Sequence, residues 1–117
     1  MGTIQRFDSG PRMSQAVVHG DTVYLAGQVA QGASGESVAN QTKDILARVD
    51  ALLAGAGSDK SKALSATIWL ASMDTFNEMN AIWDAWVDPA NPPTRACVEA
   101  RLAAPGFTVE IAIVAAK

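Results

Sequence analysis

The stretch Phe107-Thr-Val-Glu-Ile-Ala-Ile-Val-Ala115 predicts a β-strand, because branched apolar residues recur at alternate positions. One row of its side chains consists of Phe107, Val109, Ile111, Ile113 and Ala115, and the opposite row of Thr108, Glu110, Ala112 and Val114. Most members of both rows are apolar, so both faces of the strand need cover. Helices are expected to cover one face, and we expect another copy of the chain to cover the other.

Turn-forming segments separate this strand from the residues before it. Residues 103–106, Ala-Ala-Pro-Gly, connect it to a second β-prone run, which we expect to form a strand over Thr94–Leu102. Residues 88–93 contain three prolines and are predicted to form a loop. Proline removes a backbone donor and is excluded from helix interiors and central strands.

The first third of the chain is predicted to form β-strands followed by a loop. Two β-rich runs flank Gly20-Asp21 and predict a hairpin over Gln15–Gln28. A further strand over Ile4–Phe7 is weakly marked, and residues 31–36 contain turn-forming residues and predict a loop.

Two helices are expected in the middle of the chain, on either side of a strand over Ala63–Leu70. The first helix ends at Gly55-Ala-Gly57. The second covers Asp74–Val87, with Thr75 and Glu78 spaced as in a capping box. The side chains at helical spacing in the first helix are Val38, Thr42, Ile45, Val49, Leu52 and Ala56.

The expected order of elements is β-β-α-β-α-β-β. This order predicts an α+β fold in which two helices cover one face of a mixed sheet. The 117 residues suffice for one ordinary domain and are too few for two, so we expect a single domain over residues 1–117.

Composition excludes several classes of function. The formal net charge is -3, which disfavours nucleic acid as the main partner, because an acidic chain repels phosphate backbones. Cys97 is the only cysteine and His19 the only histidine, so neither a disulfide framework nor a His/Cys metal cluster is possible. We expect no metal and no cofactor. The sequence contains no signal-peptide pattern and no membrane-spanning run, and we expect a cytoplasmic protein.

Arg95 and Glu110 are the candidate functional residues. Arg95 shares a row with Cys97 and follows the rigid proline loop, and we expect Glu110 on the neighbouring strand. A guanidinium group can bind a small carboxylic acid through two hydrogen bonds, and a glutamate can handle a proton or a water. An Arg–Glu ion pair at a subunit interface explains the same pattern and is the commoner arrangement. Cys97 is read as a packing residue rather than a nucleophile, since no histidine lies near it in the pattern.

Several motifs occur in an order that resembles a known family. They are Met13-Ser-Gln-Ala16, Tyr24-Leu-Ala-Gly-Gln28, Gln41, Phe76-Asn-Glu-Met-Asn80, Pro93-Thr-Arg-Ala-Cys-Val-Glu99 and Val109-Glu-Ile111. Together they span nearly the whole chain and resemble the YjgF-type reactive intermediate deaminase (Rid) family. The resemblance implies a chorismate-mutase-like fold and a homotrimer with clefts between adjacent subunits. It also implies hydrolysis of 2-imino or 2-enamino acids, such as 2-aminoacrylate, to 2-keto acids and ammonia without a cofactor.

The resemblance also implies roles for individual residues. Arg95 corresponds to the clamp for the substrate carboxylate, and Glu110 to the residue that orients or activates water. Backbone groups around Gly27 and Cys97 correspond to substrate contacts, and Asn80 to a residue of the cleft wall. Imine hydrolysis is already fast in water, so positioning and one proton-handling group suffice.

Two positions depart from the family pattern. Met13 stands where family members often carry a tyrosine, and Ala26 replaces a serine, so two hydroxyl groups are missing. Met13 offers a pliable apolar wall instead. Arg12 adds a cation that either binds a second acidic group or faces solvent. These departures leave open a non-catalytic protein that binds small carboxylates. An RNA-directed activity, a label that some relatives carry, fits poorly with the acidic charge.

Overall fold

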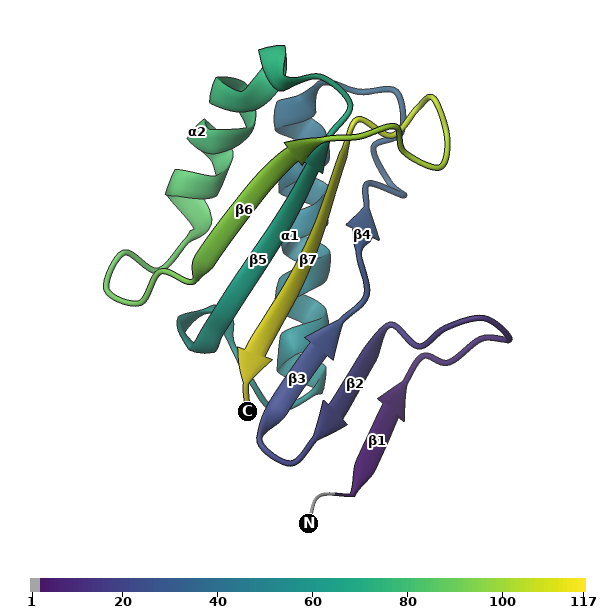
Figure 1. The fold of residues 1–117 in the computed structure, drawn as a ribbon, viewed down its shortest axis with the longest axis vertical. Helices are drawn as coiled ribbons and strands as arrows, with labels where there is room; N and C mark the ends of the chain where they lie inside the picture. The colour runs from purple at the N-terminus through teal and green to yellow at the C-terminus, as the bar shows by residue number, and fades with distance from the viewer. Residues whose placement is uncertain (1–2) are drawn as a thin grey trace.

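The computed structural model describes residues 3–117, which form one seven-stranded mixed sheet with two α-helices on one face (Figure 1). The strand order is β1-β2-β3-β7-β5-β6, and β4 also pairs with β7. The strands are β1 (Ile4–Phe7), β2 (Ala16–His19), β3 (Thr22–Leu25), β4 (Gln28–Val29), β5 (Ala63–Leu70), β6 (Thr94–Glu99) and β7 (Val109–Ala116). The helices are α1 (Val38–Gly55) and α2 (Phe76–Trp86). The expected α+β architecture is confirmed, and the weakly marked strand at the N-terminus is present.

Strand β7 lies in the middle of the sheet, and its two rows differ in burial as predicted. Val109, Ile111, Ile113 and Ala115 are fully buried beneath the helices. The opposite row, which begins with Glu110, is only half-buried. The same alternation continues on β5, where Ala66, Ile68 and Leu70 are buried. The core therefore lies between this face of the sheet and the helices.

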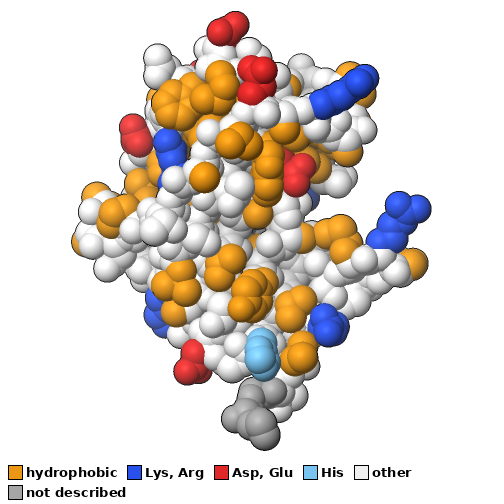
Figure 2. Space-filling view, viewed as in Figure 1, with side chains coloured by type: hydrophobic (Ala, Val, Ile, Leu, Met, Phe, Trp, Pro, Cys, Tyr) orange, Lys and Arg blue, Asp and Glu red, His pale blue; other side chains and the backbone are white. Residues whose placement is uncertain are grey.

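The second face of the sheet carries exposed apolar side chains. Tyr24 and Val98 are about half exposed, at 48% and 47%, and both lie in rows opposite to the core. Figure 2, which views the molecule from this side, shows apolar side chains distributed across the surface. The sequence-based expectation of an uncovered apolar face is confirmed for the isolated chain.

The sequence predicted that the strand of Arg95, β6, lies beside the strand of Glu110, β7. This prediction was wrong, because β5 lies between them. Strand β5 pairs in parallel with β6 on one side and antiparallel with β7 on the other. The unit β5-α2-β6 is a strand–helix–strand crossover, which brings its two strands together in parallel. β6 also ends at Glu99 rather than at Leu102, so Arg101 lies in the following loop.

Strands β3 and β4 follow the same edge of β7 with an interruption between them. Tyr24 lies opposite Val114, whereas Gln28 lies opposite Ile111. The segment between Tyr24 and Gln28 is therefore one residue longer than the matching segment of β7, as in a β-bulge. Bulges bend a strand and redirect side chains, and this one includes Gly27.

The two helices begin and pack through polar contacts. Ser37 caps α1 by accepting a hydrogen bond from the backbone N–H of Asn40 at 3.1 Å. The Trp86 indole N–H donates to both carboxylate oxygens of Asp50, at 3.0 and 3.1 Å, and ties α2 to α1. No helix among residues 3–117 is long and apolar enough to cross a membrane.

The predicted capping box at the start of α2 was wrong. Residues Met73–Thr75 form a short 3-10 turn before the helix, and the Thr75 hydroxyl donates to the carbonyl of Ser72. Glu78 instead accepts a hydrogen bond from the backbone N–H of Ala39 at 2.9 Å. Because Ala39 lies in the first turn of α1, Glu78 links the two helices at this end.

Candidate active site

Arg95 lies at the start of the edge strand β6 and points toward α2. Its Nη1 donates a hydrogen bond to Asn80 Oδ1 at 2.7 Å. The guanidinium carbon is 5.8 Å from the centroid of the Phe76 ring and 5.5 Å from that of Trp83. Such distances allow attraction between a cation and an aromatic face. Arg95 and Asn80, two of the predicted site residues, are therefore in direct contact.

Cys97 shares the Arg95 row and is half-buried against the helix layer. Burial raises the pKa of its thiol, and the nearby Arg95 lowers it by a smaller amount. A raised pKa keeps the thiol protonated at neutral pH, which is unfavourable for a nucleophile. The reading of Cys97 as a packing residue agrees with this environment.

Glu110 lies on the other face of the sheet, next to Gly27. A Cβ atom built on Gly27 would lie 3.0 Å from the carboxyl carbon of Glu110. Burial raises the pKa of the Glu110 carboxyl. The bulge between β3 and β4 places Gly27 beneath this carboxylate, so the structure brings these two predicted site residues together.

The arginine and glutamate of one chain face opposite sides of the sheet. Arg95 is paired with Ala66, which belongs to the buried row beneath the helices. Glu110 is paired with Trp69, which belongs to the row on the uncovered face. Within one chain the candidate site is thus divided into an Arg95 half, with Asn80 and Cys97, and a Glu110 half, with Gly27.

Met13 lies in the loop between β1 and β2 and is 48% exposed. With Arg12 it lines a cavity of about 400 Å³ formed largely by this loop. The side chains of Gln15 and Gln28 hydrogen-bond at 2.9 Å and connect the loop to β4. The loop that carries Met13 and Arg12 is therefore held beside β4, and neither residue hydrogen-bonds to Arg95.

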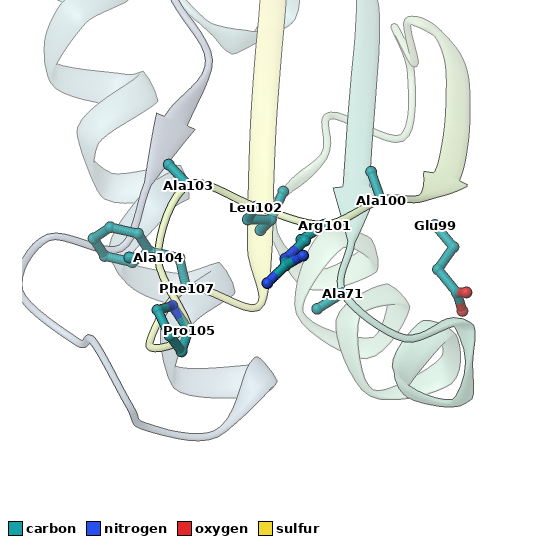
Figure 3. A pocket seen from close by; sticks show the side chains of 9 residues that line it. All are labelled: Ala71, Glu99, Ala100, Arg101, Leu102, Ala103, Ala104, Pro105 and Phe107. Atoms are coloured by element: carbon teal, nitrogen blue, oxygen red, sulfur yellow. The ribbon is translucent and has the colours of Figure 1, made fainter.

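A cavity of about 620 Å³ contains none of the predicted site residues. It is formed by the loop between β6 and β7, and Figure 3 shows the Arg101 side chain beneath this loop, near Ala71. Glu99, at its edge, accepts a hydrogen bond from the backbone N–H of Met73 at 2.9 Å. Arg101 does not continue the row of Arg95 and Cys97, because β6 ends at Glu99.

The sequence analysis did not predict that Phe76 and Trp83 contact Arg95. The signal was their spacing with Asn80 on one stripe of α2, at positions i, i+4 and i+7. Among residues 3–117 no three His, Cys, Asp or Glu side chains lie close enough together to hold a metal ion.

The chain has two layers, with Arg95 and Glu110 on opposite faces of its sheet, and comparisons with known proteins give its family. The family model described as Endoribonuclease L-PSP matches residues 3–117. The chain belongs to this family, also known as the YjgF/RutC family.

Sequence identity and structural similarity to individual proteins support this membership. The chain is 45% identical to a RutC family protein of Haemophilus influenzae over 113 residues, which is 97% of each chain. A crystal structure of a YjgF family protein from Neisseria meningitidis matches with a TM-score of 0.95 and 48% identity, over 98% of this chain and 95% of the other. The human 2-iminobutanoate/2-iminopropanoate deaminase is 32% identical over 87% of this chain and 77% of its own length.

Proposed function

We propose that this protein hydrolyses 2-imino and 2-enamino acids to 2-keto acids and ammonia. The proposal rests on the environment of the Arg95 side chain. Its guanidinium is exposed and oriented by Asn80, and within residues 3–117 it forms no ion pair. An oriented cation without a carboxylate partner suits a ligand that brings its own carboxylate. The name of the human relative supports the same class of substrate.

The proposed reaction needs one bound carboxylate and one water. Arg95 holds the substrate carboxylate, which fixes the adjacent C=N carbon. Water adds to that carbon, and Glu110 accepts a proton from the water. The proton passes to the nitrogen and gives a carbinolamine. The hydroxyl proton of the carbinolamine then moves to the nitrogen as the C–N bond breaks and the C=O bond forms, which releases a 2-keto acid and ammonia. A 2-enamino acid enters this sequence after a proton shift from its nitrogen to C3 gives the imine. Backbone groups near Gly27 and Cys97 contact the substrate in this proposal.

We further propose that the working form is a homotrimer with its sites between subunits. Arg95 and Glu110 face opposite sides of the sheet in one chain, so one chain cannot direct both at one small substrate. The uncovered apolar face that carries Glu110 offers a surface for another copy. In this arrangement Arg95 of one subunit meets Glu110 of its neighbour, and Met13 contributes to the cleft wall. The cytoplasmic location expected from the sequence stays a prediction.

A non-catalytic carboxylate-binding protein is the second candidate. The absence of two hydroxyl groups, at Met13 and Ala26, favours it, because those groups would contact a substrate in related deaminases. The retained Arg95 and Glu110 favour catalysis. The family model is described as an endoribonuclease, but the net charge of -3 opposes RNA binding.

The deciding experiment is an imine-hydrolysis assay. An L-amino-acid oxidase generates imines from several amino acids, and the loss of imine is followed with wild-type protein, Arg95→Ala and Arg101→Ala. The expected result is acceleration by wild type and Arg101→Ala, and none by Arg95→Ala. Binding of 2-oxobutanoate without acceleration of any imine would favour the carboxylate-binding protein. Full activity of Arg95→Ala would refute the site.

A further inference from the structure

One face of α2 presents three side chains to the same guanidinium group. Phe76, Asn80 and Trp83 follow one helical stripe. The stripe meets Arg95 through a 2.7 Å hydrogen bond from Nη1 to Asn80 Oδ1 and through two aromatic rings whose centroids are 5.8 and 5.5 Å away. A single rigid element therefore fixes the guanidinium from several directions.

The acceptor that α2 provides is electrically neutral. An amide oxygen satisfies one N–H of the guanidinium and leaves its positive charge uncompensated, whereas a carboxylate would form an ion pair and compete with an acidic ligand. Among residues 3–117, Asn80 is the only side chain that accepts a hydrogen bond from Arg95. A guanidinium has five N–H donors, so most of them stay available.

The aromatic rings restrict a side chain that would otherwise be mobile. Arg95 is exposed, and a long exposed side chain loses rotamer freedom when it binds a ligand. Contacts with Phe76 and Trp83 limit that freedom before any ligand arrives. Less entropy is then lost on binding, and the planar donors keep a fixed direction.

We propose that Asn80, together with Phe76 and Trp83, is a positioning residue that orients the Arg95 guanidinium and keeps its charge free for a ligand carboxylate. This inference rests on the proposed function for the class of ligand. It assigns Asn80 a role that differs from the one implied by the family resemblance. Asn80 acts through Arg95 and does not itself bind the substrate.

The first test requires no ligand. Nuclear magnetic resonance of ¹⁵N-labelled protein measures rotation of the Arg95 guanidinium, whose signals are assigned by their loss in Arg95→Lys. Rotation is expected to be slow in wild type and in Asn77→Ala, an exposed position on the same helix, and faster in Asn80→Ala and Trp83→Leu. Equal rotation in wild type and Asn80→Ala would overturn the proposal.

The second test measures the effect of charge on binding of 2-oxobutanoate. Asn80→Asp places a carboxylate where the neutral acceptor stood, and we expect the dissociation constant to rise about tenfold or more. Asn77→Asp changes the net charge equally on the same helix and is expected to alter binding by less than about twofold. Unchanged affinity in a folded Asn80→Asp protein would contradict the proposed role.

A double-mutant cycle separates action through Arg95 from direct contact with the ligand. In the Arg95→Lys background, adding Asn80→Ala should change binding by less than about twofold, because the group that Asn80 orients is gone. An equal loss of affinity in both backgrounds would show direct contact and overturn the proposal. If wild type hydrolyses no imine, the proposed function fails, and the measurement without ligand still decides the role of Asn80.

Discussion

The carboxylate of Glu110 lies against the α-carbon of Gly27, in space that any larger residue at position 27 would occupy. A methyl group there would overlap Oε2 of Glu110 and lie 3.0 Å from its carboxyl carbon. The requirement for glycine is spatial, because the obstructing atoms belong to the Glu110 side chain. Those atoms end a flexible side chain, so a larger residue is expected to displace the carboxylate without unfolding the protein.

Gly27→Ala therefore tests the placement of Glu110. We expect the variant to fold and to bind 2-oxobutanoate within about twofold of wild type, while kcat falls about tenfold or more because the carboxylate no longer faces the water. Steady-state imine hydrolysis and a binding titration measure the two effects. Gly55→Ala, where no atom lies within 4 Å of an added Cβ, is the matched control. An unchanged kcat in Gly27→Ala would assign the water to another group.

Mixing two impaired variants tests whether each site takes residues from two subunits. Arg95→Ala is expected to be inactive alone, and Glu110→Gln to hydrolyse imines only slowly. After denaturation and refolding as an equal mixture, about one quarter of the intersubunit sites would combine an intact arginine with an intact glutamate. Activity should therefore return to about that fraction of wild type. No recovery, despite mixed oligomers shown by native mass spectrometry, would contradict a shared site.

The raised pKa of Glu110 predicts how activity depends on pH. Burial disfavours the ionised carboxylate, so the rate should fall on acidification at a pH above the usual range of a glutamate. Glu110→Gln should bind 2-oxobutanoate normally, hydrolyse imines slowly and lack this acidic limb. A pH–rate profile of both proteins checks the prediction, and an acidic limb retained in the variant would assign it to another group.

The same shift in pKa affects stability. A carboxyl whose pKa is raised by folding favours the folded state at low pH, and this contribution is lost as pH rises through the folded pKa. At neutral pH, Glu110→Gln should therefore melt at a higher temperature than wild type. The difference should narrow toward pH 4. Thermal melts at several pH values measure it, and a variant that is less stable at neutral pH would contradict the burial argument.

Gln41 is expected to be important for stability rather than for chemistry. Its side chain is fully buried, donates to the carbonyls of Glu36 and Gly106 at 3.1 and 2.9 Å, and accepts from the N–H of Thr108 at 2.9 Å. Gln41→Leu conserves size but leaves these backbone groups without partners, and should cost about 3 kcal/mol of unfolding free energy. Denaturant titration measures the loss, with the exposed Gln31→Leu as control.

Much of the fold followed from local pattern. Alternation in residues 107–115 predicted which side chains of β7 enter the core, because successive side chains of a strand point to opposite faces wherever the strand lies. Helical spacing likewise placed Phe76, Asn80 and Trp83 on one stripe. The start of α2 was less predictable, since the 3-10 turn depends on hydrogen bonds that Ser72 makes with its neighbours.

The sequence by itself determined most of the strands, both helices, the uncovered apolar face and the candidate residues Arg95, Asn80, Glu110 and Gly27. Only the tertiary structure decided which of those residues meet. Strand β5 lies between β6 and β7, so Arg95 joins Asn80 on one face while Glu110 joins Gly27 on the other. The physical reason is that alternation within a strand is a local property. Strand order, in contrast, is fixed by the crossover through α2 and by packing between segments distant in the chain.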